Sequence, residues 1–179
     1  MILHAPRDVL EIKEVVRSTP WLTIPHGGRA WLTTVRVCPL RWNNAIVRAA
    51  PQTPEHPLHL AREMEECYPL RFSVALCREV VIVWFGNREV AAAKVFAWRS
   101  MYGFRAADPR VIFAIAEQQH LELVLGSSPL ALIASAECSL GRSNRLLPYV
   151  LFHNGKRRVC ARWIEQHAGT HDYFVFLCE

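Results

Sequence analysis

This chain of 179 residues has no apolar run near the roughly 20 residues that a membrane span takes. It also has no CxxC pair, no HExxH or HxH pair, no internal repeat and no low-complexity tract. These absences exclude membrane-spanning helices, the common zinc motifs and repeat architectures. The N-terminus, MILHAPRDVLEIKEVVR, carries charges where a secretion signal needs an apolar block, so we expect a cytoplasmic protein.

The composition is that of a folded domain. Hydrophobic residues make up 51% and charged residues 21%, which argues against long disorder. The length suits one well-buried domain, or one domain with a small appendage. Six cysteines are scattered without a metal-binding spacing, and we expect most to be buried, reduced thiols, with disulfides or zinc as open alternatives. They are Cys38, Cys67, Cys77, Cys138, Cys160 and Cys178.

Periodicity and turn residues predict a mixed first half. Thr53-Pro54-Glu55 is a helix start, and the stripe that follows predicts a helix to about Cys67. A further helix is expected from about Asn87 to Tyr102, ending before Gly103. Apolar, β-branched runs predict four strands. These are Trp21–Ile24, Ala30–Val37, Arg71–Leu76 and Val80–Phe85.

The second half combines helices with a hairpin. Asp108-Pro109 and Ser128-Pro129 each predict a capped helix, to about Leu125 and Leu140 respectively. Asn154-Gly155 suits a type I′ turn, which predicts a hairpin from Tyr149 to Ile164. A last strand is expected over Asp172–Cys178. The fold class predicted is α+β, with a core over residues 1–105 and a helical and hairpin extension over 106–179 packed on it.

The segment VVIVWFGNREVAAAK, residues 80–94, is the most informative one. A buried strand that ends at Gly86 and an Ala-rich helix directly after it place free backbone N–H groups and Arg88 together. Free amides, the helix dipole and a guanidinium all favour a phosphate. In this reading Gly86 and Asn87 lie against the phosphate, Arg88 grips it, and Glu89 orients water or binds Mg²⁺. The structural alternatives are that Arg88 forms a salt bridge, that Gly86 only ends the strand, and that Glu89 only complements the helix dipole.

Positive charge is concentrated in one segment. Between Gly141 and Arg162 there are six basic residues and no acidic residue, against a net charge of +5 for the whole chain. A concentrated basic surface attracts polyanions, so we expect a nucleic-acid interface here, with a merely solvated face as the alternative. If the segment after the turn is a strand, Lys156, Arg158 and Arg162 share one face. The six residues are Arg142, Arg145, Lys156, Arg157, Arg158 and Arg162.

The order strand, amphipathic helix, paired strands, Gly-x-Arg corner and Ala-rich helix resembles the ParB/sulfiredoxin superfamily. Gly86, Arg88 and Ala92-Ala93-Lys94 fall at matching steps of the corner and helix of the ParB branch. The resemblance covers roughly residues 30–105. It implies a ParB/sulfiredoxin-like mixed sheet with flanking helices, nucleotide triphosphate hydrolysis and a Mg²⁺ site to which Glu89 and Glu117 would contribute.

Two departures narrow what the resemblance implies. The family's acidic residue after the glycine is Asn87 here, and its second arginine is Glu89. Sulfiredoxins need a cysteine beside the glycine, and Phe85-Gly86-Asn87-Arg88 has none, which excludes sulfiredoxin activity. No DNA-reading helix-turn-helix follows the corner, so recognition of a partition site is not expected.

A free-standing, bacterial-looking chain of this size with a substituted corner looks most like the plasmid fertility-inhibition factors of the oncogenic suppression (Osa) type. That resemblance implies a factor that blocks conjugative DNA transfer, with ATPase and DNase chemistry and DNA as a partner. The alternative is a catalytically inactive module of the same fold. Such a module would inhibit a conjugation coupling protein or a secretion-system component by direct contact.

Overall fold

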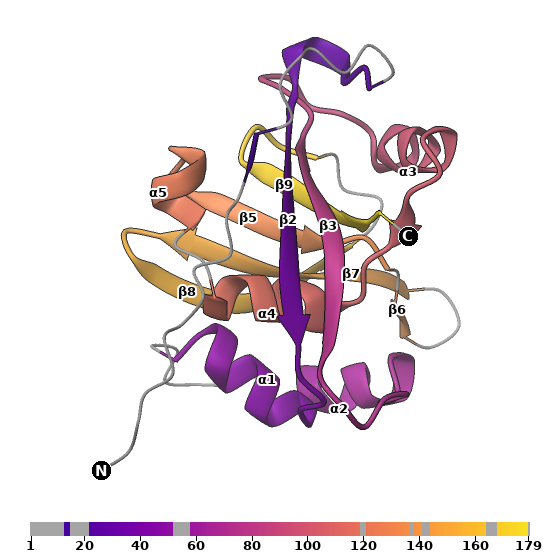
Figure 1. Cartoon of the computed structure of the whole chain (residues 1–179), viewed down its shortest axis with the longest axis vertical. Coiled ribbons are helices and arrows are strands. Elements are labelled where there is room, and N and C mark those ends of the chain that lie inside the picture. Colours follow the sequence, from indigo (N-terminus) through magenta and orange to yellow (C-terminus); the bar gives the residue numbers. More distant parts are fainter. Residues whose placement is uncertain are drawn as a thin grey trace.

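The computed structural model describes residues 13–14, 22–51, 58–118, 121–136, 138–140, 144–163 and 168–178. They form an α+β structure in which helices flank one mixed sheet (Figure 1). The strands are β1 (Lys13–Glu14), β2 (Arg29–Val37), β3 (Leu76–Trp84), β4 (Arg105–Ala106), β5 (Leu130–Ala134), β6 (Cys138–Leu140), β7 (Asn144–His153), β8 (Lys156–Trp163) and β9 (Asp172–Leu177). The helices are η1 (Pro25–Gly27, 3-10), α1 (Trp42–Ala49), α2 (Leu58–Cys67), α3 (Ala92–Met101), α4 (Pro109–Gln118) and α5 (Leu121–Leu125). None of the described helices is long and apolar enough to cross a membrane.

The sheet joins the two halves of the chain. Its main order is β1-β2-β3-β9-β5-β7-β6, with β4 paired to β9 and β8 paired to β7. The last strand, β9, lies between β3 and β5, antiparallel to the first and parallel to the second. Residues before and after position 105 therefore contribute strands to the same sheet.

Alternating side chains give the sheet two buried faces. On β9, Tyr173 and Val175 belong to one core cluster, and Phe174 and Phe176 belong to the other. Helices α1, α2, α4 and α5 cover the first face, which we call face one. Helix α3 covers the second, face two, mainly through Trp98 and its aromatic neighbours. Figure 1 shows α3 apart from the other helices for this reason.

Several elements follow their local sequence signals. The β7–β8 hairpin turns at Asn154 and Gly155, with φ of 52° and 72°, as the type I′ prediction requires. Asp108 caps α4: its Oδ1 accepts a hydrogen bond from the backbone N–H of Arg110 at 2.7 Å. Helix α2 ends at Cys67 as expected, whereas its predicted start at Thr53 lies outside the described residues.

Other predicted elements are wrong. The segment predicted as a helix after Pro129 contains strands β5 and β6, because the five residues of β5 are all buried between β7 and β9. A short apolar run of this kind does not distinguish strand from helix. Residues 71–75 are irregular, and β3 begins only at Leu76. Residues 22–24 are not a strand but lead into η1. By contrast, the segment predicted as a helix from Pro109 to about Leu125 is helical over all its described residues, in α4 and α5.

Helix α1 was not predicted, because Asn43-Asn44 resembles a turn. Its buried residues Trp42, Ala45, Ile46 and Ala49 have the i, i+3, i+4, i+7 spacing of an amphipathic helix. Trp42 is only 2% exposed and packs edge-on against Phe113 of α4, with ring centroids 6.0 Å apart. Trp42 is therefore a core residue.

Candidate functional site

The glycine corner does not open a helix. Helix α3 begins at Ala92, five residues later than the predicted start at Asn87. The chain stays extended because Val90 and Ala168 exchange two backbone hydrogen bonds, of 3.1 and 2.8 Å. Asn87, Arg88 and Glu89 are exposed in a bend before this bridge. The premise that Arg88 lies beside the free amides of a helix N-terminus is therefore wrong.

Gly86 lies against another part of the chain. It is buried, with φ of +93°, and a Cβ built on it would lie 2.4 Å from the carbonyl oxygen of His26 in η1. A carbonyl oxygen so close to the corner disfavours a phosphate there, because both groups carry negative charge. The close approach that the sequence assigned to a ligand is used for packing between η1 and the end of β3. The ligand roles of Gly86, Asn87, Arg88 and Glu89 stay predictions.

Replacing Gly86 with alanine tests the packing role. We expect the free energy of unfolding to fall by more than the roughly 1–3 kcal/mol that a positive φ costs a non-glycine residue, because the Cβ also meets the His26 carbonyl. The matched control is Gly103→Ala, where φ is +72° and nothing lies within 4 Å of the added Cβ. Urea denaturation measures both variants. Equal losses in the two would show that contact with η1 contributes nothing.

The two predicted metal ligands lie on opposite sides of the sheet. Glu89 precedes α3 on face two, whereas Glu117 lies near the end of α4 on face one. Glu117 forms an ion pair with Arg48 of α1. In the described part of the chain, no group of three or more His, Cys, Asp or Glu side chains is arranged to hold a metal ion. A Mg²⁺ site shared by these two carboxylates is therefore not supported.

The basic segment divides between the surface and the interior. Lys156, Arg158 and Arg162 share a face of β8 as predicted, since Val159 between them points into face one. Lys156 and Arg158 are exposed, but Arg162 is only partly exposed and forms an ion pair with Asp172. Arg157 donates to the backbone carbonyl of Ala116, and burial lowers the pKa of its guanidinium.

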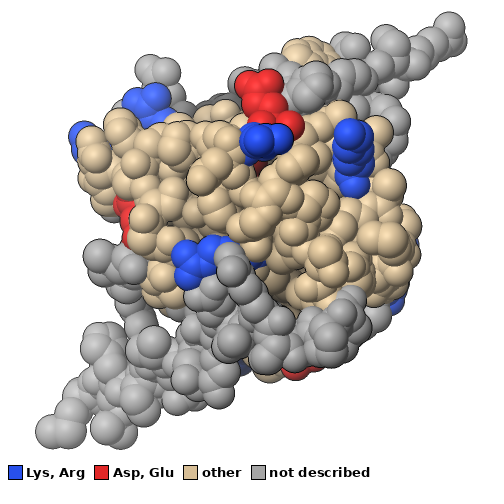
Figure 2. Space-filling view, turned by 90° about the horizontal axis from the view of Figure 1, so that it is seen from above, with Lys and Arg blue, Asp and Glu red and all other residues tan. Residues whose placement is uncertain are grey.

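The remaining residues of that segment do not complete a patch that the structure describes. Arg142 and the side chain of Arg145 lie outside the described residues. From above, Lys and Arg side chains stand apart from one another and do not merge into one basic surface (Figure 2). A nucleic-acid interface here stays a prediction.

The cysteines differ in part from the expectation of buried, reduced thiols. Cys67, at the end of α2, is disulfide-bonded. Cys38, Cys77, Cys160 and Cys178 are reduced thiols, as expected, but Cys77 is exposed rather than buried. Scattered spacing in the sequence carries no information on such a pairing, because a disulfide depends on which elements meet in the fold.

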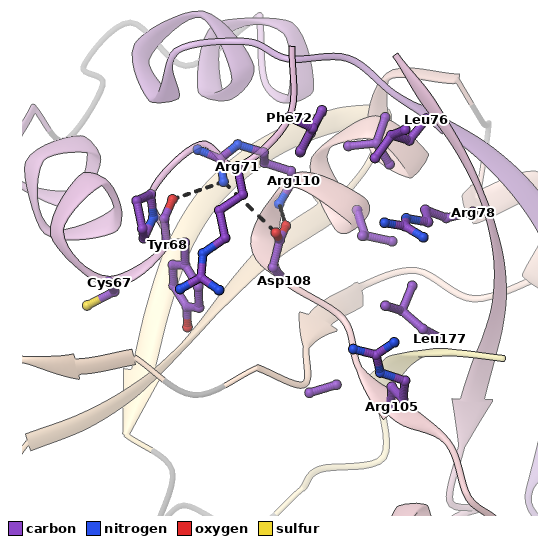
Figure 3. A pocket seen from close by; sticks show the side chains of 14 residues that line it. Cys67, Tyr68, Arg71, Phe72, Leu76, Arg78, Arg105, Asp108, Arg110 and Leu177 are labelled. Carbon is purple, nitrogen blue, oxygen red and sulfur yellow. Dashed lines mark hydrogen bonds and ion pairs between the residues drawn. The ribbon is translucent and has the colours of Figure 1, made fainter. Parts of the chain in front are cut away.

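A cavity of about 410 Å³ lies on face one, at the opposite end of β3 from Gly86. Of its fourteen lining residues, four are arginines and one is acidic (Figure 3). The arginines come from the segment after α2 (Arg71), from β3 (Arg78), from β4 (Arg105) and from the first turn of α4 (Arg110). The acidic residue is Asp108. The cavity thus has a surplus of positive charge.

Strand pairing places two of these arginines on either side of Leu177. Arg105 of β4 is directly opposite Leu177 of β9. On the other side of β9, Val80 of β3 is opposite the same leucine, so Arg78 lies at the diagonal position on the same face. Direct and diagonal neighbours lie within about 5 to 8 Å, which long side chains bridge readily. Figure 3 shows Arg78 and Arg105 with Leu177 between them.

Arg110 forms the floor of the cavity. It is 3% exposed, and its guanidinium carbon lies 3.8 Å from the centroid of the Trp42 ring. Its Nη1 donates to the backbone carbonyl of Tyr68 at 2.9 Å and lies 3.9 Å from Oδ2 of Asp108. Within the described residues, its Nε and Nη2 have no hydrogen-bond acceptor. A buried cation whose carboxylate partner Asp108 is 3.9 Å away leaves a positive potential that an anion would compensate.

The protonation of Asp108 reflects the same surroundings. Burial raises the pKa of its carboxyl above the ordinary value, although Arg110, the two backbone N–H groups of Arg110 and Val111, and Arg78 oppose the rise. Burial also lowers the pKa of the Arg110 guanidinium, whereas the charges of Asp108 and Glu65 raise it. Burial raises the pKa of the Tyr68 hydroxyl, and the nearby charge of Asp108 raises it further. That hydroxyl donates to the carbonyl of Ala136 at 2.7 Å and so stays protonated.

This shift of the Asp108 pKa gives a pH dependence. A carboxyl whose pKa rises on folding stabilises the fold below its unfolded pKa, and this contribution is lost as the pH rises through the folded pKa. Asp108→Asn keeps the helix cap and removes the titration. We expect the unfolding free energy of the wild type, relative to this variant, to fall as the pH rises above 3.8. A difference that rises with pH in urea titrations would contradict the direction of the shift.

Sequence reasoning did not find this cavity. It identified Asp108-Pro109 as a helix cap but did not note that Arg110 follows it, which is the same combination of helix start and arginine sought at Gly86. Arg78 and Arg105 carry no local signal, since only the pairing of β3 and β4 with β9 brings them to one cavity. Arg71 reaches the same cavity from the segment after α2.

Comparison of this chain with models of known protein families, with curated protein sequences and with solved structures finds no match. What the cavity binds is therefore inferred from its own residues.

Proposed function

We propose that this protein is a binding module for a phosphate-bearing ligand, held in the arginine-lined cavity at the start of α4. The observation that carries the proposal is the convergence of four arginines from four segments on one cavity with a single lining carboxylate. Guanidinium groups match phosphate oxygens in pairs, and each charge-assisted hydrogen bond contributes about 1.5–3 kcal/mol. The start of a ten-residue helix adds its dipole to this field.

Arg71 and Arg105 are the side chains best placed to reach a ligand from solvent. Both are exposed at the cavity, and no hydrogen bond or ion pair engages either guanidinium within the described part of the chain. Arg110 lies behind them as a fixed charge, because Trp42 and the Tyr68 carbonyl hold it. In this arrangement Arg71 and Arg105 contact the ligand directly, and the buried Arg110 adds to the positive electrostatic potential of the cavity.

Titration calorimetry with inorganic phosphate tests the proposal. We expect Arg105→Gln and Arg71→Gln each to weaken binding by about 10-fold or more, the loss of one charge-assisted contact. The matched control is Arg88→Gln, which removes an equally exposed arginine at the other end of β3 and should bind phosphate like the wild type. Absence of phosphate binding in the wild type, or equal loss in all three variants, would overturn the proposal.

The activities that the resemblance implies are separate predictions. The structure supports the α+β class with a mixed sheet, and the finer ParB/sulfiredoxin assignment rests on the resemblance alone. Inhibition of conjugative transfer, with DNA, a coupling protein or a secretion-system component as partner, rests on it too. The binding module is the alternative that the cavity favours. Mg²⁺-dependent release of phosphate from ATP or CTP by the wild type and by Arg88→Ala distinguishes hydrolysis from binding.

A further inference from the structure

The cavity is much larger than the anion that its arginines would hold. A water molecule occupies about 30 Å³ of liquid, and small-molecule sites span about 300–1,000 Å³. The volume of about 410 Å³ therefore leaves room for an organic group attached to a phosphate. An inorganic anion alone would leave most of the space to water.

The uncharged part of the lining is largely apolar. Phe72 and Leu177 are partly buried and pack against the core cluster of face one. Figure 3 shows Phe72 and Leu76 on one side of the cavity and Arg105 on another. Burial of a ligand's apolar group against such a wall stabilises the complex by about 25 cal/mol per Å². The apolar lining residues are Val37, Pro69, Phe72, Leu76, Val111 and Leu177.

We propose that the ligand is a phosphate monoester with an apolar, ring-bearing organic part, whose phosphate meets Arg71 and Arg105 and whose ring lies against Phe72 and Leu76. This inference rests on the proposed function and specifies its substrate class. The polar alternative, an ester with a hydroxyl-rich body, would need several hydrogen-bond partners for its hydroxyls. Apart from the arginines, Asp108 and Tyr68 are the lining side chains with such atoms, and the Tyr68 hydroxyl already bonds to Ala136.

The test compares three probes by titration calorimetry on the full chain: inorganic phosphate, phenyl phosphate and glycerol phosphate. We expect phenyl phosphate to bind at least about 10-fold more tightly than the other two, from burial of its ring. Phe72→Ala should reduce the preference for phenyl phosphate over inorganic phosphate. If that variant does not fold, the comparison of the three probes on the wild type decides alone.

The outcomes separate this inference from the proposed function. If inorganic phosphate binds and phenyl phosphate binds no better, the apolar ligand class is overturned while the anion site stands. If glycerol phosphate binds best of the three, the ligand is polar and the inference is equally overturned. If none of the probes binds the wild type, both the site and the ligand class are overturned.

Discussion

Replacing Trp42 with alanine is expected to lower the free energy of unfolding by about 3–5 kcal/mol, the usual cost of removing a buried aromatic side chain. Trp42 is 2% exposed and contacts Tyr68, Phe113 and the guanidinium of Arg110. Its loss leaves a void between α1 and α4 and removes the ring on which Arg110 stacks. Urea denaturation followed by circular dichroism measures the change.

Two further tryptophan variants serve as controls. Trp163, at the end of β8, is 44% exposed, so Trp163→Ala should change stability by no more than about 0.5 kcal/mol. Trp42→Phe keeps a ring in place and removes an indole N–H that has no acceptor within the described residues, so its cost should be well below that of alanine. Equal effects of Trp42→Ala and Trp163→Ala would show that Trp42 does not support the cavity floor.

Asp172→Ala is expected to destabilise the protein by about 3 kcal/mol or more, because it removes one partner of a buried ion pair. The side chains of Asp172 and Arg162 are 10% and 13% exposed, and Oδ2 of Asp172 also accepts a hydrogen bond from the backbone N–H of Gly169 at 2.6 Å. The substitution leaves the Arg162 cation buried without this carboxylate at the start of β9. Thermal and urea denaturation measure the loss.

The exposed pair on α2 provides the comparison. The side chains of Arg62 and Glu66 are 85% and 68% exposed. They lie one helical turn apart, with Nε of Arg62 at 3.6 Å from Oε1 of Glu66. Such a pair contributes about 0.2–0.5 kcal/mol, so Glu66→Ala should have almost no effect. A loss of similar size for Asp172→Ala would show that Arg162 finds an equally good partner elsewhere. The basic residues of β8 would then contribute to the charge of the surface more than to the stability of the core.

The elements that were predictable are those whose signal is local. Asn154-Gly155 determines a type I′ turn by itself, and the Asp108 carboxylate caps α4 by accepting a hydrogen bond from the backbone N–H of Arg110. The structure of the segments that were predicted wrongly depends on tertiary contacts. Leu130–Ala134 is a strand because β7 and β9 lie on either side of it, and residues 87–91 are not helical because Val90 pairs with Ala168. Neither partner is near in sequence.

In the candidate site, too, only the features with a local sequence signal could be predicted. The physical argument for an anion, an arginine together with a helix start, is sound but was applied to Gly86, where a carbonyl of η1 occupies the approach. The matching combination is Asp108-Pro109-Arg110, whose surroundings depend on strand register. Arg71, Arg78 and Arg105 are ordinary surface arginines in the sequence. Their convergence follows from the insertion of β9 beside β3, which no local pattern reveals.

The central claim is that the anion site lies at the start of α4 and not at the glycine corner. It is tested most directly by following the Nε–Hε resonances of the arginine side chains by NMR while inorganic phosphate is added. We expect the resonances of Arg71, Arg78 and Arg105 to shift together and saturate, while that of Arg88 stays in place. A saturating shift of Arg88 with no change in the three cavity arginines would contradict the account.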